Sequence, residues 1–336
     1  MIVLLLILIT SCFGCSCDIP ADEHVFRVLS YNVENLFDAT LDGTEHAEYQ
    51  DPGKWSERSY RLRLRNLGKI LLDPALNHPD VIILQEIENE RVVEDLLSFH
   101  LAKKGYRSYA VARTEGSPIS VGAISRHPIV RSSVHAVPGG RNILEVVIST
   151  PVEEVVIFAL HAKSQIGGFS ESELLRIENA KSVSLASRDH VDKAVLVCGD
   201  FNQNPRVVHE HDGVQTALVD MIHPNAKLYG RAGSLLISGN ADFLGPGIFY
   251  NPYLAEDCRL AGSYCYGGVW HRYDQILLSP SLFDRRNWEY STFEVIRFPY
   301  LFKSDGTPKR WDLKTLSGYS DHLPVMVTLT RSPWEI

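Results

Sequence analysis

Two polar residues that follow an apolar run in the middle of the chain carry side chains suited to phosphate chemistry. Residues 195–198 read as a strand buried on both faces, Gly199 ends it, and Asp200 and Asn202 follow. Alternate residues of a strand point the same way, so we expect the Asp200 carboxylate and the Asn202 amide to lie side by side. The carboxylate can take a proton from water or hold a metal ion, and the amide can donate to an oxyanion. Taken alone, the pair is better explained as an ordinary turn.

Polar residues of similar types stand at the ends of the other expected strands. They are Asn32, Glu86, His161, Asp274, Asp321 and His322. In layered α/β structures functional sites assemble from such strand ends, so we expect these side chains to meet. Each residue taken alone could instead have a structural role, as a turn residue, a helix cap or a buried histidine. Their recurrence at strand ends favours a shared site.

The segments that would position these residues alternate between strands and helices. Strands are expected at 25–32, 81–86, 106–112, 119–125, 143–149, 155–161, 195–198, 272–279 and 325–330. Helices are expected at 56–72, after the strand at 81–86 up to about residue 100, and at 171–189. The strands between 106 and 161 follow one another closely, which favours hairpins over βαβ crossovers. Residues 230–268 show little periodicity and are expected to form a long ordered loop. No repeat, linker or break in composition divides the chain, so one domain is expected over residues 21–336.

The charge balance limits how a phosphate-bearing substrate would be held. Of the 336 residues, 41 are acidic and 33 basic, which gives a formal net charge of −8. A chain of this charge has no general positive field for nucleic acid, so a phosphate-bearing substrate would need bound cations or a local basic patch. One face of the helix expected at 56–72 carries four basic residues, Arg58, Arg61, Arg65 and Lys69. A solvated helix surface is the main interpretation of this face, and phosphate contact is the alternative.

The N-terminal segment indicates export. Residues 2–9 form an unbroken apolar run that is too short to span a bilayer but matches the length of a signal-peptide core. Residues 9–12 resemble a bacterial lipobox, in which Cys12 would be lipidated after cleavage, and Cys15 is a poorer second candidate. A plain cleaved signal peptide is the alternative. We therefore treat residues 1–20 as a leader and expect a cell-envelope lipoprotein or a secreted protein.

The six cysteines divide into a leader group and three others. Cys198 lies in the buried strand and is expected to be an inert core thiol. Cys258 and Cys265 flank a short loop and could close a disulfide in an oxidising compartment, a point that the sequence leaves open. No Cys/His spacing matches a structural zinc site.

Six short motifs, taken in order, resemble the endonuclease/exonuclease/phosphatase family, the deoxyribonuclease I-like superfamily of metal-dependent phosphoesterases. The motifs are Tyr31-Asn32-Val33, Leu84-Gln85-Glu86, Leu160-His161, Gly199-Asp200-Phe201-Asn202, Tyr273-Asp274-Gln275-Ile276 and Ser320-Asp321-His322-Leu323-Pro324-Val325. Residues 31–38 and 262–266 further resemble an exported bacterial branch of that family. The resemblance implies an α/β fold, a four-layered sandwich in which two packed mixed sheets are flanked by helices.

The resemblance also implies a role for each residue that matches a motif. Glu86, Asn32 and Asp321 would hold a divalent metal ion, with Asn35 as a second candidate for the asparagine. Hard oxygen ligands of this kind suit Mg²⁺ or Mn²⁺. The remaining matches are catalytic: Asp200 would activate water, Asn202 and His161 would bind the phosphate, and Asp274 would orient His322. A carboxylate behind His322 would fix the tautomer of its ring and favour the imidazolium.

The expected activity is metal-assisted in-line attack of water on a phosphodiester bond. An exported monomeric nuclease acting on DNA or RNA is the leading interpretation. A phosphomonoesterase or a sphingomyelinase-like phospholipid phosphodiesterase is the first alternative. A non-catalytic surface lipoprotein of the same fold is the second, although no expected site residue is missing from the chain.

Overall fold

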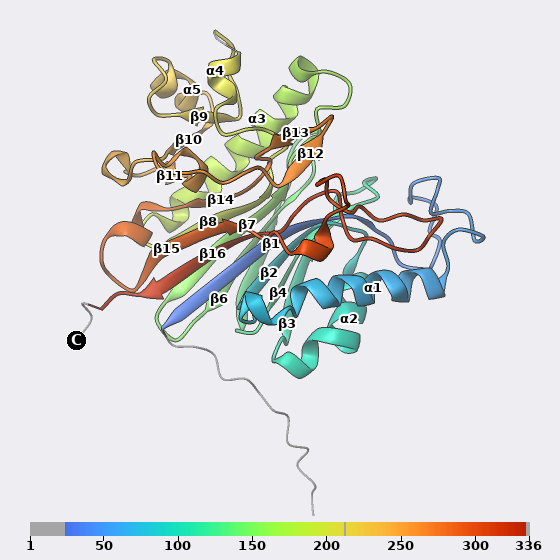
Figure 1. Cartoon of the computed structure of the whole chain (residues 1–336). Coiled ribbons are helices and arrows are strands. Elements are labelled where there is room, and N and C mark those ends of the chain that lie inside the picture. Colours follow the sequence, from blue (N-terminus) through green and yellow to red (C-terminus); the bar gives the residue numbers. More distant parts are fainter. Residues whose placement is uncertain (1–23, 212, 334–336) are drawn as a thin grey trace, which may run out of the picture.

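Residues 24–211 and 213–333 are described in the computed structural model, and their main strands form two mixed sheets that pack face to face (Figure 1). The first sheet has six strands in the order β15-β16-β1-β2-β4-β3. Their bounds are β1 Val25–Leu36, β2 Val81–Ile87, β3 Ser108–Ala112, β4 Ser120–Ser125, β15 Trp288–Val295 and β16 Val325–Arg331. Strands β1 and β2 are parallel, so their carboxyl ends meet at the same edge of the sheet.

The second sheet has eight strands in the order β5-β6-β7-β8-β14-β11-β10-β9. Their bounds are β5 Ile129–His135, β6 Ile143–Ser149, β7 Glu154–His161, β8 Ala194–Asp200, β9 Leu218–Asp220, β10 Leu235–Ser238, β11 Ile248–Tyr250 and β14 Asp274–Leu278. Strands β7 and β8 are parallel, whereas β14 runs antiparallel to β8. The start of β14 therefore lies beside the carboxyl ends of β7 and β8.

Helices lie outside the two sheets and complete the layered arrangement (Figure 1). They are α1 Glu57–Leu71, α2 Glu90–Leu96, which continues as a π turn over Leu97–Leu101, α3 Phe169–Ala186, α4 Val207–Glu210 and α5 Ala226–Arg231. Helix α1 begins at Ser56, whose side chain accepts a hydrogen bond from the Ser59 N–H, a standard N-terminal cap. Its apolar stripe, with Tyr60 and Leu64 fully buried, packs toward the six-stranded sheet.

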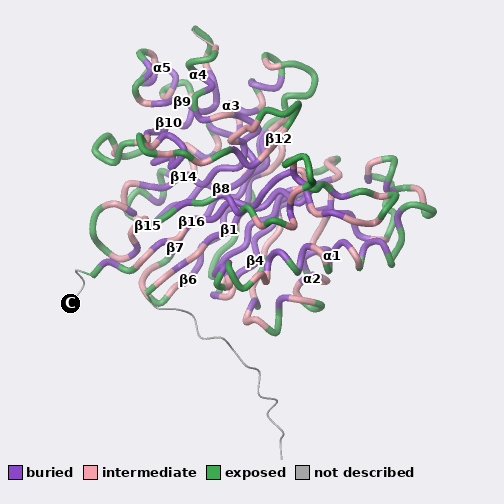
Figure 2. The backbone as a smooth tube through the Cα atoms, viewed as in Figure 1, coloured by how far each residue is buried: buried purple, intermediate pink, exposed green. Residues whose placement is uncertain are grey.

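Alternating apolar residues let the eight-stranded sheet bury both of its faces. On β7, Val155 and Ile157 join the core between the sheets, while Val156 and Phe158 face the layer that contains α3. Each fully buried side chain of this size contributes about 1.5–3 kcal/mol. The buried backbone is concentrated along these central strands, and exposed backbone lies in the peripheral loops (Figure 2). The four-layered sandwich expected from the family resemblance is confirmed.

The sequence predicted the long elements well and the short ones poorly. The helix expected at 56–72 is α1, that at 171–189 is α3, and the strands of the 106–161 region do form antiparallel pairs. The prediction of a long loop at 230–268 is wrong, because β10, β11 and β12 (Tyr264–Tyr266) lie there, and β12 forms a hairpin with β13 (Val269–His271). Strands of three or four residues are too short to show a period in the sequence. Strands β5, β9 and β15 were also not predicted.

The cysteines of the described residues are all free thiols. Cys198 is buried in the core between the sheets, as predicted, and burial raises the pKa of its thiol. Cys258 and Cys265 do not form the disulfide that the sequence left open. The predicted leader, residues 1–20 with Cys12, lies outside the described residues. Within the described parts of the chain, no helix has the length and apolar character needed to cross a membrane.

Candidate active site

Most of the predicted site residues meet at one end of the two sheets, because the strand topology brings their ends together. His161 and Asp200 are the last residues of the parallel strands β7 and β8, and they pair in register. Asp274 opens the antiparallel strand β14 and lies opposite Asp200. Asn32 and Gln85, the neighbour of Glu86, are paired on β1 and β2 of the other sheet.

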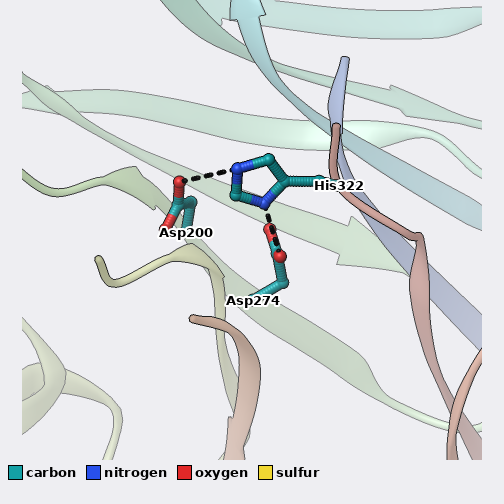
Figure 3. Close-up of side chains that lie close together, drawn as sticks. All are labelled: Asp200, Asp274 and His322. Atoms are coloured by element: carbon teal, nitrogen blue, oxygen red, sulfur yellow. Dashed lines mark hydrogen bonds and ion pairs between the residues drawn. The ribbon is translucent and has the colours of Figure 1, made fainter. Parts of the chain in front are cut away.

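His322 lies between two carboxylates (Figure 3). Its Nδ1 donates to Asp274 Oδ2 at 2.7 Å, and its Nε2 lies 3.9 Å from Asp200 Oδ2. The hydroxyl of Ser263 also donates to Asp274 Oδ2, and Ser320 Oγ accepts from the His322 N–H. This arrangement fixes the ring, with Asp274 behind it and Asp200 in front of it.

The Asn32 amide connects a second group of residues to the first. Its Nδ2 donates to Glu86 Oε1 at 3.0 Å and to Asp200 Oδ2 at 3.1 Å. The Asn35 N–H holds the other oxygen of Glu86 at 2.9 Å. His161 Nε2 lies 3.7 Å from Glu86 Oε1 and 3.6 Å from Asp200 Oδ2. The two sheets therefore contribute to one continuous polar site.

The backbone is irregular where it delivers these side chains. Glu86, Asn35 and Asn202 have φ values of 64°, 52° and 50°, in the left-handed region. The β1–β2 pairing shifts register between Asn32 and Leu36, as bulges near sites commonly do. Such irregularities change the direction in which a side chain leaves the strand.

Asn202 departs from the geometry that the sequence suggested. Strand β8 ends at Asp200, so the two side chains do not share one face of a strand. Instead the Asn202 N–H donates to Asp200 Oδ1 at 2.8 Å, and its Nδ2 donates to the carbonyl of Ala162 at 3.1 Å. Asn202 thus lies beside Asp200 through a turn, and one amide hydrogen is already used by the backbone.

The two histidines differ in charge because their surroundings differ. Burial alone would lower the pKa of His322, but Asp274, Asp200 and Asp321 raise it well above its ordinary value. Burial and the cation Arg141 lower the pKa of His161 well below its ordinary value. These shifts favour the cationic form of His322 and the neutral form of His161.

Asp200 is poised between its charged and neutral forms. Burial raises its pKa to about 7, Asp274 and Glu86 add to this, and the facing His322 opposes it. A carboxyl group with a pKa near neutrality can exchange a proton with water at physiological pH. Perturbed groups of this kind cluster at functional sites.

Four residues of the site were not given a role by the sequence. Glu34 is buried, ion-paired with Arg310, and its pKa is raised to about 7 by burial and by Asp321. Arg141 donates to the carbonyl of Ala162. The other two are Ser263 and Tyr264, which contact Asp274 and His322. Ser263 and Tyr264 lie in the motif at 262–266, whereas nothing in the sequence indicated a role for Arg141.

The predicted metal ligands do not all contact one another. Glu86 is partly accessible, with 17% of its side chain exposed. Asn32 presents its amide nitrogen, while its oxygen accepts the Glu34 N–H at 3.1 Å. Asp321 interacts electrostatically with Glu34 and His322, and no hydrogen bond or ion pair in the described residues joins it to Glu86. Carboxylate oxygens such as those of Glu86 and Asp321 are the hard donors that a divalent cation prefers.

A further group of potential ligand atoms, from Asp200, Asp274 and His322, also lies within 4.8 Å of one another. The short hydrogen bond to Asp274 occupies Nδ1 of His322. We therefore interpret this group as a histidine held by carboxylates.

Comparison with known proteins agrees with the fold. No curated protein matches the sequence significantly. Zebrafish (D. rerio) TDP2 complexed with a single strand DNA product superposes with a TM-score of 0.56 at 17% identity, over 91% of this chain and 99% of that chain. A Bacteroides thetaiotaomicron endonuclease/exonuclease/phosphatase family protein gives 0.53 at 18% identity, over 93% and 99%. The mannosyl-6-phosphatase of the same species gives 0.52 at 17%, over 91% and 99%.

The model of one protein family, described as Endonuclease/Exonuclease/phosphatase family, matches residues 27–229, more than half of the chain. The match includes Asn32, Glu86, His161, Asp200 and Asn202. The protein belongs to the endonuclease/exonuclease/phosphatase family and is a divalent-metal-dependent hydrolase of phosphoester bonds.

Proposed function

We propose that the protein is an exported phosphodiesterase that cleaves nucleic acid with the help of Mg²⁺ or Mn²⁺. The observation that carries the choice of substrate is a stack of aromatic rings that begins on His322. Tyr264 stacks on His322 with ring centroids 4.5 Å apart, and Tyr273 stacks on Tyr264 at 5.6 Å. His271 continues the series at 4.8 Å from Tyr273. A nucleobase can stack on such a surface, which is worth about 1–3 kcal/mol per base.

The hairpin β12–β13 carries the partly exposed end of this stack, whereas Tyr273 and His322 are buried. It contributes Tyr264 and His271, and Tyr266 at its tip is 72% exposed. Figure 1 shows the hairpin projecting at the end of the sheets where the site lies. A nucleotide flanking the scissile phosphate would find aromatic surface within reach of this hairpin.

Local cations replace the general positive field that the acidic chain lacks. Arg141 is close enough to Glu86 and Asp200 for each to raise the pKa of its guanidinium, although burial lowers that pKa overall. Lys163 lies near His161, whose pKa it helps to lower. Phosphates entering the site would therefore meet basic groups around its acidic centre.

Each residue of the site has a separate role in the proposed hydrolysis. Glu86, with Asp321 and Asn32, would hold the metal ion, which supplies charge stabilisation at the phosphoryl oxygens. Asp200 accepts a proton from the attacking water, since its pKa of about 7 lets it act as a base near neutrality. Cationic His322, held by Asp274, and the N–H groups of the site stabilise the charge that develops on the phosphate.

The test is hydrolysis of single-stranded DNA, RNA, supercoiled plasmid and bis-p-nitrophenyl phosphate with Mg²⁺ or Mn²⁺. Cleavage of the nucleic acids should be lost with EDTA and in His322→Ala. Tyr266→Ala should raise KM for DNA several-fold and leave turnover of bis-p-nitrophenyl phosphate unchanged, because that substrate lacks bases. Phe243→Ala, another exposed aromatic (56%) outside the hairpin, is the matched control. Hydrolysis of every phosphoester except the nucleic acids would refute the substrate assignment.

A phosphomonoesterase is the second candidate, and one observation favours it. An open cleft lined by Gly140, Arg141, Asn142 and Lys163 adjoins His161. A small phosphate ester could bind its basic side, and the similar solved structures include a mannosyl-6-phosphatase. Release of phosphate from sugar phosphates at a higher kcat/KM than cleavage of DNA would favour this candidate.

Export and the state of the chain after export are also proposals. The apolar run at 2–9 and the lipobox-like residues 9–12 support a lipoprotein leader with Cys12 as the anchor. Fractionation of cells that express the full chain, with Cys12→Ala as the variant, tests this. Retention in the membrane fraction regardless of the substitution would refute the anchor. Sedimentation of the mature chain tests the monomer that we propose.

A further inference from the structure

Acidic side chains gather where the loop after β1 passes the end of β2, outside the active site. Oxygen atoms of Asp42, Glu45 and Glu88 lie within 4.8 Å of one another. Asp38 borders them, since its N–H donates to Glu88 Oε2 at 2.6 Å. Glu45 and Glu88 are 4% and 2% exposed, whereas Asp42 is on the surface. We refer to Asp42, Glu45 and Glu88 as the loop carboxylates.

Two observations on the described residues show that one oxygen of this group is unsatisfied and that no cation forms an ion pair with it. Glu88 Oε1 is buried and accepts no hydrogen bond. In residues 24–211 and 213–333, no lysine, arginine or histidine forms an ion pair with Asp38 or with any loop carboxylate. Burying carboxylates together without a cation is costly, and proteins normally resolve it by pairing or by metal coordination.

We propose that the loop carboxylates bind a calcium ion at a second metal site, separate from the catalytic one. The ligands would be carboxylate oxygens of Asp42 and Glu88, with Glu45 and Asp38 as further donors. All are hard oxygens, and Ca²⁺ takes six to eight of these in flexible geometry. Backbone carbonyls and water would complete the shell.

The spacing within the loop favours calcium over magnesium. Asp38, Thr40, Asp42 and Gly43 stand at positions 1, 3, 5 and 6 of the twelve-residue pattern of calcium-binding loops. Gly43 has a φ of +91°, which fits the sharp turn that the glycine makes in such loops. The chain departs from the pattern at its twelfth position, which is Tyr49. Glu88, from the end of β2, supplies the missing carboxylate from outside the loop.

A cation here would connect two segments that the active site depends on. The loop follows Asn35, whose N–H holds Glu86, and Glu88 is two residues beyond Glu86. Bound Ca²⁺ would cross-link the loop to the end of β2 and so keep this hydrogen bond in place. The site is therefore structural, and it stands whether or not nucleic acid is the substrate.

Terbium luminescence tests the proposal directly, because Tb³⁺ replaces Ca²⁺ and is sensitised by nearby indoles. The Trp55 Nε1–H donates to the carbonyl of Asp38 at 2.7 Å, which puts an indole next to the site. Titration of the metal-free mature chain with Tb³⁺ alone should give emission that Ca²⁺ displaces at much lower concentration than Mg²⁺. Asp42→Asn and Glu88→Gln should each weaken Tb³⁺ binding at least tenfold.

Two control variants separate this site from other carboxylates. Asp305 is exposed and accepts from the N–H and hydroxyl of Thr307, just as Asp42 does from Thr44, so Asp305→Asn should leave binding unchanged. Glu86→Gln, in the catalytic site, should also retain the luminescent site. Asp42→Asn changes a surface residue and keeps the protein folded if Glu88→Gln does not. Emission that survives Asp42→Asn, or that is lost in Glu86→Gln alone, would overturn the proposal.

Discussion

Replacement of Asp200 with asparagine should change how the stability of the protein depends on pH. Asp200 is 1% exposed, and its pKa is raised to about 7, chiefly by burial and also by Asp274, against the opposing effect of His322. In the unfolded chain the same carboxyl group titrates near its ordinary value of about 3.9. Between these two values the folded protein holds a proton that the unfolded chain has released.

The difference between the folded and the unfolded pKa of Asp200 sets the sign and the size of the change in stability with pH. Where the folded state binds the additional proton, the free energy of unfolding falls by about 1.4 kcal/mol for each pH unit. The favourable contribution of Asp200 is therefore complete below pH 4 and is lost as the pH rises toward 7. Between pH 5 and pH 8 the wild-type protein should lose about 3 kcal/mol from this group. The carboxamide of the Asp200→Asn variant does not titrate, so the variant should not show this loss.

The assay is urea unfolding at pH 5 and pH 8 of the wild type and of Asp200→Asn, with EDTA present so that no cation favours the charged carboxylate. Asparagine changes the hydrogen bonds with Asn32 and Asn202, but that cost is the same at both pH values. The free energy of the variant minus that of the wild type should therefore be about 3 kcal/mol more favourable at pH 8 than at pH 5. Asp305→Asn, at an exposed carboxylate whose pKa is lowered, should show no such change over this range.

The outcome is decisive in either direction. One refuting outcome is that the free energy of unfolding of the variant minus that of the wild type stays constant with pH, and another is that it shrinks as the pH rises. Either result would show that Asp200 is ionised throughout and would refute its assignment as a base with a pKa near 7. A difference that grows, together with loss of hydrolysis in the variant, would show that the fold tolerates an unfavourable buried carboxyl group at the site of function.

Three other substitutions test the remaining parts of the site. Asp274→Asn should lower kcat by about 10²–10⁴-fold and shift the pKa of His322 downward. NMR titration of the His322 ring measures this pKa, and an unchanged value would contradict the pairing of Asp274 with His322. Glu86→Gln should raise the Mg²⁺ concentration needed for half-maximal activity by at least about tenfold, and an unchanged requirement would place the metal elsewhere. Gly199→Ala should destabilise the fold by at least about 2 kcal/mol in urea unfolding, because a Cβ there would lie 1.9 Å from the carbonyl oxygen of Leu160. A variant as stable as the wild type would show that β7 and β8 can separate.

The layered fold could be predicted from the sequence because its central strands and long helices carry strong periodic patterns. The uninterrupted apolar run of β8 is buried on both faces, as its composition indicated. The edge of the same sheet could not be predicted. Strands β9, β10 and β11 have only three or four residues each, and their pairing depends on β14 and on contacts far apart in the sequence.

The residue types of the site could be predicted, but their arrangement could not. Strand ends marked His161, Asp200 and Asp274, and the structure does place them together. The expected alignment of Asp200 with Asn202 along a strand is wrong, because β8 stops at Asp200 and the chain then turns through a left-handed residue. A period of two applies only while the backbone stays extended.

Backbone irregularity also explains why the arrangement of Glu34, Asn35 and Glu86 could not be predicted from the sequence. Glu34, Asn35 and Glu86 all have positive φ, and each lies where a strand of the six-stranded sheet departs from regular pairing. Non-glycine residues hold this conformation only when their surroundings compensate for the strain. Here the compensation is visible: the Asn35 N–H binds Glu86, and Glu34 pairs with Arg310. The strained backbone and the carboxylates thus support each other, so a cation bound by Glu86 would add to the interactions that hold this backbone in place. On this reasoning metal binding should stabilise the fold as well as enable hydrolysis, and the thermal midpoint should rise with Mg²⁺ in the wild type and much less in Glu86→Gln.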